Sequence, residues 1–196
     1  ALNDLAFLFE RNGHFEQAIL LTNYLYEINP NKYALNISSL YERMGQFDKA
    51  YQSLPKELNI GKNEKPSDIE VRYFQRKAAW IIISQRNEEL KQEGIDSLNK
   101  LEELLFSHNE DNNPLWLWHF YNIKANLHEW NNDLDEAIIF YKRCLSIPTL
   151  GAFEYGATFV NMAISYRCKY INQIEKDQKI IDKSIKLGRL GMLLKQ

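Results

Sequence analysis

The chain has 196 residues, of which 45% are hydrophobic and 13% aromatic, and this composition argues against intrinsic disorder. Its longest apolar run, residues 78–83, is far shorter than the roughly 18 residues that span a bilayer, which excludes a membrane span within this sequence. The formal net charge of −2 gives no overall field that would attract nucleic acid. Two cysteines, Cys144 and Cys168, are too few for a disulfide framework and predict a reducing, cytoplasmic location.

Apolar residues recur at helical spacing along almost the whole chain, and strand-like alternation is absent over any useful length. This pattern predicts an all-α fold of about ten helices in five antiparallel pairs. The expected helices cover residues 2–12 and 15–28, 32–44 and 47–58, 68–85 and 88–107, 115–130 and 134–146, and 151–170 and 174–194. Gly13 can end the first helix in a left-handed conformation, and Pro55 is expected to shorten or bend the fourth helix.

A linker is expected between the second and third helix pairs, where residues 59–67 (NIGKNEKPS) contain Gly61 and Pro66. The expected organisation is therefore two regular repeats in residues 1–58, the linker, and three less regular helix pairs in residues 68–196 that continue the same stack. Because the chain begins with Ala and has no charged and apolar leader, we expect a processed protein or a fragment of a longer one.

Residues 5–18 and 37–50 carry the same sequence motif in two similar copies at an offset of 32 positions, which is typical of one supersecondary repeat. Its two copies align Phe9 with Tyr41, Glu10 with Glu42, Arg11 with Arg43, Gly13 with Gly45, Phe15 with Phe47, and Ala18 with Ala50. These residues and Pro30 resemble the tetratricopeptide repeat family, strongly over residues 1–58, moderately over 115–170 and weakly over 59–114. The resemblance implies a right-handed α-solenoid and a non-catalytic scaffold that binds a peptide or a partner's helix in a concave groove.

In this family the first helices of the repeats line the groove, which implies a surface rich in Asn, Arg and aromatic side chains. The expected groove residues are Asn36, Arg43, Arg72, Arg76, Trp118, Tyr121, Asn122, Asn161 and Arg167. Arg72 and Arg76 lie one helical turn apart, so both guanidinium groups are candidates for gripping a carboxylate.

Part of this set resembles the carboxylate clamp of some family members, which holds the acidic C-terminus of a chaperone. Asn36, Arg72 and Arg76 match three of its five positions, whereas Asn3 and Phe7 stand where a Lys and an Asn are expected. The resemblance implies a protein or peptide partner with an acidic segment, and the alternative is that these residues form a solvated scaffold.

The tryptophans of residues 115–130 are divided by helical spacing between core and surface. Trp116, Phe120, Ile123, Leu127 and Trp130 form one apolar stripe, which predicts that they are buried. Trp118 and Tyr121 lie off this stripe, so we expect them at the surface as packing residues, a protein contact or a small-ligand platform.

Catalytic and metal-binding patterns are not found in the sequence, so we expect no enzyme activity, metal or cofactor. The four histidines are isolated from one another, with no two of them three or four residues apart, and no activated nucleophile motif occurs. The alternative is a regulatory or substrate-recruiting domain of a larger enzyme or sensor.

The C-terminal segment is both basic and apolar. Residues 167–196 contain eight Lys or Arg against three acids, which is typical of a solvated helix face and leaves nucleic-acid binding as a weaker alternative. An apolar cluster in the same segment consists of Leu187, Leu190, Met192, Leu193 and Leu194. We expect a further repeat, a fused domain or a second copy of the chain to cover this cluster.

Overall fold

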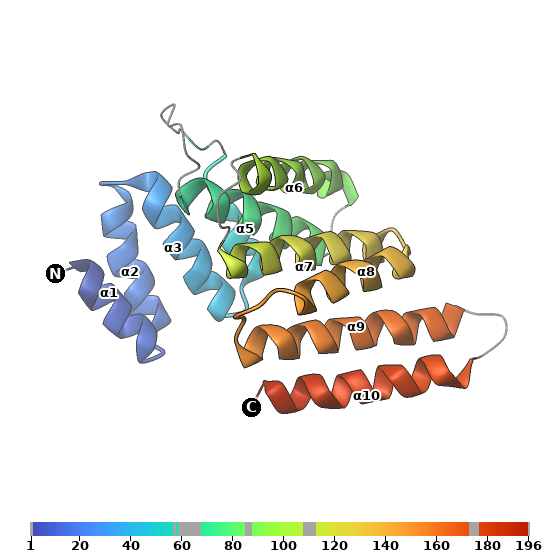
Figure 1. Ribbon diagram of the computed structural model, residues 1–196. Coiled ribbons are helices and arrows are strands. Elements are labelled where there is room, and N and C mark those ends of the chain that lie inside the picture. Colours follow the sequence, from blue (N-terminus) through green and yellow to red (C-terminus); the bar gives the residue numbers. More distant parts are fainter. Residues whose placement is uncertain are drawn as a thin grey trace. The chain divides into compact units, whose positions relative to one another are not determined.

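The computed structural model describes residues 2–56, 58, 68–84, 88–107, 113–172 and 177–195, and within these ranges it contains helices and no strand (Figure 1). The prediction of an all-α fold is confirmed. The helices are α1 (Leu2–Arg11), α2 (Phe15–Tyr26), α3 (Pro30–Arg43), α4 (Phe47–Gln52), α5 (Asp68–Ser84), η1 (Glu88–Leu90), α6 (Lys91–Phe106), α7 (Pro114–Trp130), α8 (Leu134–Leu145), α9 (Ala152–Asn172) and α10 (Gln178–Leu194). In the part of the chain that is described, no helix is both long and apolar enough to cross a membrane.

The chain forms two compact units, unit 1 from Ala1 to Trp80 and unit 2 from Ile81 to Gln196. Most of α5 belongs to unit 1, and its last turn belongs to unit 2. The predicted linker, residues 59–67, lies outside the described residues, and the expected division of the chain around it stays a prediction.

Three helices end in turns of the same type, and this explains why their C-terminal ends lie close to the positions predicted from the sequence. After α1 the residue Gly13 has φ +77°, its N–H donates to the Glu10 carbonyl, and the His14 N–H donates to the Phe9 carbonyl. This pair of hydrogen bonds is the Schellman motif, which satisfies carbonyl groups left over at a helix end. Gly45 (φ +70°) ends α3 and Asn132 (φ +59°) ends α7 with the same two bonds.

Unit 1 is packed around small residues that let its helices approach closely. Ala18 on α2 and Ala50 on α4 have no exposed surface, and Ala18 packs in a cluster with Ile19 and Leu40. Helix α4 ends at Gln52, six residues before the predicted end at position 58. Pro55 explains this early end, because proline has no N–H for a helical hydrogen bond and restricts the residue before it.

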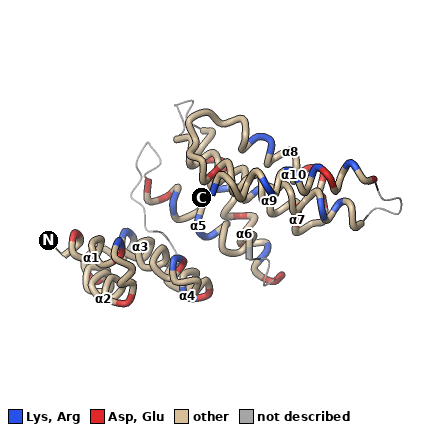
Figure 2. Tube along the Cα trace, turned by 90° about the horizontal axis from the view of Figure 1, so that it is seen from below, with Lys and Arg blue, Asp and Glu red and all other residues tan. Residues whose placement is uncertain are grey.

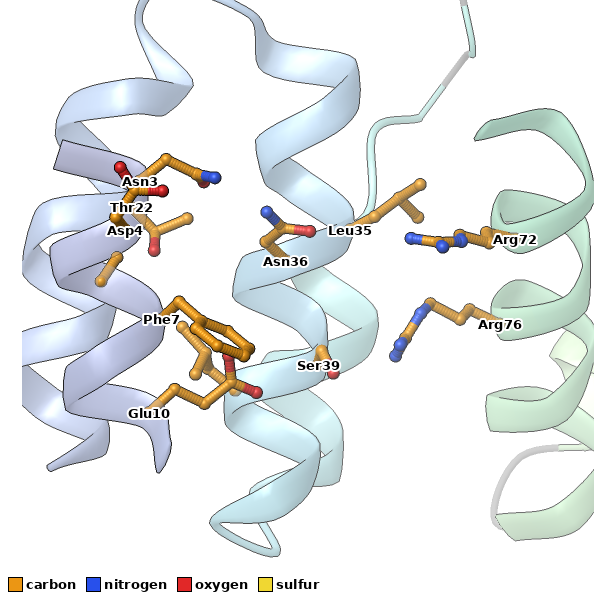
Figure 3. Close-up of a pocket in the computed structure, with 12 residues that line it drawn as sticks. Asn3, Asp4, Phe7, Glu10, Thr22, Leu35, Asn36, Ser39, Arg72 and Arg76 are labelled. Carbon is orange, nitrogen blue, oxygen red and sulfur yellow. The ribbon is translucent and has the colours of Figure 1, made fainter. Parts of the chain in front are cut away.

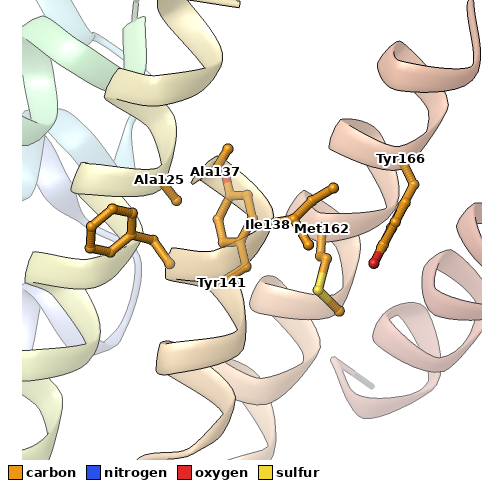
Figure 4. Close-up of a cluster of buried hydrophobic side chains, with 7 residues drawn as sticks. Ala125, Ala137, Ile138, Tyr141, Met162 and Tyr166 are labelled. Carbon is orange, nitrogen blue, oxygen red and sulfur yellow. The ribbon is translucent and has the colours of Figure 1, made fainter. Parts of the chain in front are cut away.

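The core of unit 2 lies between α7, α8 and α9 (Figure 4). Its buried members are Ala125, Ala137, Ile138, Phe140, Tyr141, Met162 and Tyr166. The alanines leave room for the tyrosine and isoleucine side chains, and these side chains hold the three helices together by burying apolar surface. Helix α10 packs on the far side of α9 (Figure 1). Among the described helices, α9 is the one with which α10 makes extensive contact.

Candidate binding groove

A pocket of about 430 Å³ opens in unit 1 between α1, α3 and α5 (Figure 3). Its polar lining includes Asn3 and Asp4 from α1, Asn36 from α3, and Arg72 and Arg76 from α5. Asn36, Arg72 and Arg76, which the sequence assigns to one groove, therefore do line one pocket. We call this pocket the unit 1 groove.

Local sequence features position the two walls that carry the expected groove residues. Helix α3 begins at Pro30, and the Asn29 side chain accepts a hydrogen bond from the Lys32 N–H at 3.2 Å, which caps the helix. On α5, buried Tyr73 donates a hydrogen bond from its hydroxyl to the Pro55 carbonyl at 2.8 Å. Tyr73 thus fixes the helix on which the neighbouring Arg72 lies.

Two glutamates in equivalent positions of the repeat bind arginines of the following repeat. The Arg43 guanidinium lies 2.5 Å from a Glu10 carboxylate oxygen, and that of Arg76 lies 2.8 Å from a Glu42 oxygen. Arg43 also lies over the Phe15 ring, with its central carbon 5.2 Å from the ring centroid. Arg43 and Arg76 therefore help to connect successive repeats.

Arg72 differs from these two arginines. It is exposed on α5, it points toward the groove in Figure 3, and among the described residues it has no carboxylate within ion-pair distance. Arg76 is thus ion-paired with Glu42 and Arg72 is not, and the expectation that both guanidinium groups grip a carboxylate stays a prediction.

The opposite wall of the groove is acidic, which the sequence did not indicate. Asp4 and Glu10 on α1 line the groove together with Asn3 and Phe7 (Figure 3). Glu10 is already paired with Arg43, so Asp4 adds the negative charge at α1 and Arg72 the positive charge at α5, with Asn36 between them. Sequence reasoning followed one stripe of α1 through Asn3 and Phe7, and it missed the two acids because they lie beside that stripe.

Trp118 is buried, and this corrects the assignment of the α7 tryptophans. Its side chain is only 6% exposed, and the indole N–H donates to the Thr158 hydroxyl on α9 at 2.8 Å. Trp116 and Trp130, which were expected in the core, are half-buried. Helix α7 contacts α6, α8 and α9, so more than one of its faces is covered and a single apolar stripe does not describe it.

The other expected groove residues of unit 2 have mixed surroundings. Asn122 is buried, and its side-chain oxygen accepts a hydrogen bond from the Asn161 amide at 3.0 Å. Tyr121 is half-buried against the core, with the Arg143 guanidinium 5.9 Å from its ring centroid. Arg167 is exposed on α9. Asn122 and Asn161 thus join α7 to α9.

A half-buried carboxylate in unit 2 also escaped the sequence analysis. Glu129, near the end of α7, accepts a hydrogen bond from the Ser165 hydroxyl of α9. Burial raises the pKa of Glu129, although the Ser165 hydrogen bond acts in the opposite direction. Tyr141 has a raised pKa as well, because of burial and then because of the nearby Glu129 charge. The described residues contain no group of three His, Cys, Asp or Glu side chains that could hold a metal ion.

Comparison with known proteins agrees with the repeat architecture. A sequence model of the tetratricopeptide repeat matches residues 119–148, which include much of α7 and all of α8. No curated protein matches the sequence. A crystal structure of MamA superimposes with a TM-score of 0.57 at 16% identity, covering 96% of this chain and 93% of that chain. A second crystal structure of the MamA protein gives a TM-score of 0.58 at 16% identity, covering 98% of this chain and 89% of that chain.

At this level of identity the MamA structures show a shared fold, a tetratricopeptide-repeat-like α-solenoid. The matched repeat shows the family signature in unit 2, whereas the most regular motif in the sequence lies in unit 1. The matched repeat and the shared fold therefore agree on a tetratricopeptide-repeat-like architecture for this chain.

Proposed function

We propose that this chain is a non-catalytic interaction module and that its unit 1 groove binds an acidic segment of a partner protein. The fold is typical of protein-interaction scaffolds. The observation that carries the proposal is Arg72, which lines the groove and lacks a carboxylate partner among the described residues, whereas Arg43 and Arg76 are both paired. An arginine presents its donors in a fixed planar fork that matches a carboxylate.

The remaining lining suits an extended peptide. Asn3 and Asn36 offer amide donors and acceptors for a peptide backbone, and Ser39 adds a hydroxyl. A pocket of about 430 Å³ has room for a few side chains and not for a whole helix. Because Asp4 lies on the α1 wall, the ligand's acidic group belongs at the α5 wall, and a backbone N–H or a basic group belongs near α1.

The experiment is a binding assay with fluorescent peptides that end in Asp and Glu residues, each compared with a copy in which Asn and Gln replace the acids. A hydrogen bond to a charged group contributes about 1.5–3 kcal/mol, so Arg72→Glu is expected to weaken binding of the acidic peptide by about 10- to 100-fold. Arg72→Lys keeps the charge but loses the planar fork, and we expect it to bind between the two.

Lys56→Glu provides the matched control, because Lys56 is exposed in unit 1 and does not line the groove. Circular dichroism first establishes that every variant keeps its helical content. If Lys56→Glu weakens binding as much as Arg72→Glu, the effect is general electrostatic attraction, and the proposal fails. Equal binding of the acidic and amide peptides would also contradict it. The cytoplasmic location expected from the two cysteines stays a prediction.

A further inference from the structure

The outer side of α10 is an exposed surface that mixes apolar and basic residues. The inner side of the helix packs on α9 through small residues, and Ser184 donates a hydrogen bond to the Ala163 carbonyl at 2.7 Å. On the outer side, Ile185 is 48% exposed and Leu193 is 68% exposed. We define the α10 face as Asp182, Ile185, Lys186, Arg189, Leu190 and Leu193, which together line a shallow hollow of about 410 Å³.

A second exposed surface lies on α2, in unit 1. Its inner side is buried through Ala18, Ile19, Thr22 and Leu25. On the outer side, Leu20 is 72% exposed and Tyr24 is 64% exposed, one turn apart. Glu16 and Glu27 are exposed at the two ends of the same stripe, since the spacings of four, four and three residues return to one side of a helix. We define the α2 face as Glu16, Leu20, Tyr24 and Glu27.

The two faces lie in segments of opposite charge (Figure 2). Residues 2–28 contain four Asp or Glu and a single Arg, and residues 177–195 contain five Lys or Arg and two Asp. One of these two aspartates, Asp182, accepts a hydrogen bond from the Gln178 side-chain amide at 2.9 Å. The α2 face is therefore apolar and acidic, and the α10 face is apolar and basic.

We propose that the α2 face of one copy of this chain docks on the α10 face of a second copy. Leu20 and Tyr24 would pack against Ile185, Leu190 and Leu193, while Glu16 and Glu27 would meet Lys186 and Arg189. Each face runs eleven positions along its helix, a length of about 16 Å. Both the apolar contact and the ion pairs can therefore be made along the whole interface.

Charge decides against pairing two α10 faces with each other. Such a symmetric contact would bring the Lys186 and Arg189 side chains of both copies together, and like charges at close range are unfavourable. Pairing α2 with α10 instead uses two different surfaces of each copy, so each copy can take part in two such contacts. Self-association is therefore expected to rise steeply with concentration.

The test uses two charge-reversal variants of the whole chain, measured by analytical ultracentrifugation over a wide concentration range at low salt. The α10 variant carries Lys186→Glu and Arg189→Glu, and the α2 variant carries Glu16→Lys and Glu27→Lys. The wild-type chain is expected to self-associate. Each variant alone is expected to associate at least tenfold more weakly.

Mixing the two variants gives the decisive result. The intact α2 face of the α10 variant can bind the intact α10 face of the α2 variant. The two reversed faces, now acidic on α10 and basic on α2, are complementary as well, so the mixture recovers both contacts. We expect the equimolar mixture to recover the association of the wild-type chain, with both variants present in every assembled species. Association of the wild-type chain is also expected to weaken with added salt, because the pairs lie at an exposed rim.

Other outcomes would overturn the proposal. A wild-type chain that stays monomeric at every concentration shows that the two faces do not bind each other between copies. An α2 variant that associates as well as wild type shows that a different surface is used, such as α10 with itself. Lys142→Glu combined with Lys56→Glu reverses two exposed charges elsewhere and is expected to change nothing. Arg72→Glu is also expected to leave self-association unchanged. The self-association proposal and the proposal of peptide binding in the unit 1 groove can therefore fail independently of each other.

Discussion

Gly156 on α9 and Gly191 on α10 face each other so closely that neither position has room for a β-carbon. A β-carbon built on Gly191 would lie 2.6 Å from the carbonyl oxygen of Gly156 and 2.9 Å from the amide nitrogen of Val160. A β-carbon on Gly156 would lie 2.8 Å from the Gly191 carbonyl oxygen. Because these neighbours are backbone atoms, no side-chain rotation relieves the contact, and the two glycines set the distance between α9 and α10.

Gly191→Ala is therefore expected to destabilise unit 2 by about 1–3 kcal/mol, the usual range for an overpacked site. Urea unfolding followed by circular dichroism measures the change. Gly188→Ala is the matched control on the same helix, because its β-carbon would meet the Ala163 β-carbon at an ordinary distance of 3.7 Å. Alanine favours a helix over glycine, so this control is expected to be neutral or slightly stabilising. Equal losses in the two variants would contradict the explanation.

Gly45 offers a test of backbone conformation without a steric clash. Its φ is +70°, and a β-carbon there would have no atom within 4 Å, so the conformation alone resists substitution. Gly45→Ala is expected to lower the free energy of unfolding by about 1–2 kcal/mol, the cost of a left-handed L-residue. Gly45→Asn is expected to cost less, because asparagine tolerates this region and Asn132 adopts it in the equivalent turn of α7. Thermal unfolding compares the two variants.

The helices could be predicted from sequence because local chemistry decides where they end. Gly13 and Gly45 adopt the left-handed conformation that the sequence predicts for Gly13, and Pro114 begins α7 next to the Asn113 cap. Asn132 makes the same turn, but an asparagine is a weaker sequence signal than a glycine. These features depend on neighbouring residues only, so they are visible without a structure.

The surroundings of the candidate site residues could not be predicted in the same way, because they depend on contacts between repeats. The periodicity of α7 does not reveal that α9 covers Trp118, whose partner Thr158 is 40 residues away. Likewise, nothing next to Arg76 in the sequence indicates that Glu42, 34 residues earlier, engages it. The spacing of Arg72 and Arg76 placed both on one helix, but only the contacts distinguish the available guanidinium from the paired one.

The two cysteines are expected to react very differently with a thiol reagent. Burial raises the pKa of the Cys144 thiol to about 12, so almost no reactive thiolate is present at pH 8. Cys168 on α9 is only half-buried. In the folded protein a colourimetric disulfide reagent should modify Cys168 alone, and Cys144 only after unfolding. Cys168→Ser should therefore remove all reaction of the folded chain, and a remaining fast reaction would show that Cys144 is accessible.

The Glu10 and Arg43 ion pair is expected to contribute little stability, although it repeats between Glu42 and Arg76. Both side chains of the first pair are partly exposed, at 48% for Arg43 and 26% for Glu10. Pairs of this kind contribute below about 1 kcal/mol. A double-mutant cycle of Glu10→Gln and Arg43→Met measures the coupling energy, which should fall further in high salt. A larger, salt-independent coupling would contradict this estimate.

Glu129 lies three residues before Asn132, just as Glu10 precedes Gly13 and Glu42 precedes Gly45, but its electrostatic environment is different. Arginines neutralise Glu10 and Glu42, whereas within the described ranges Glu129 binds the uncharged Ser165 and has no cation within ion-pair distance. A partly buried carboxylate without a cation nearby resists ionisation. This explains in physical terms why the Glu129 pKa is raised above its ordinary value of 4.5.

Glu129→Gln is therefore expected to stabilise unit 2 in a way that depends on pH. Because the folded state holds this proton more tightly than the unfolded state, Glu129 favours folding at low pH and loses that contribution as the pH rises through the raised pKa. The glutamine variant should match wild type below pH 4.5 and become more stable than wild type at neutral pH.

Glu42→Gln occupies the equivalent position and provides the control, with the opposite sign at neutral pH because it loses the ion pair with Arg76. Urea unfolding at a series of pH values compares both variants with wild type. A difference in stability between Glu129→Gln and wild type that stays constant across that series would show that the Ser165 hydrogen bond compensates fully for burial. The Glu129 carboxylate would then be as well stabilised as those of Glu10 and Glu42.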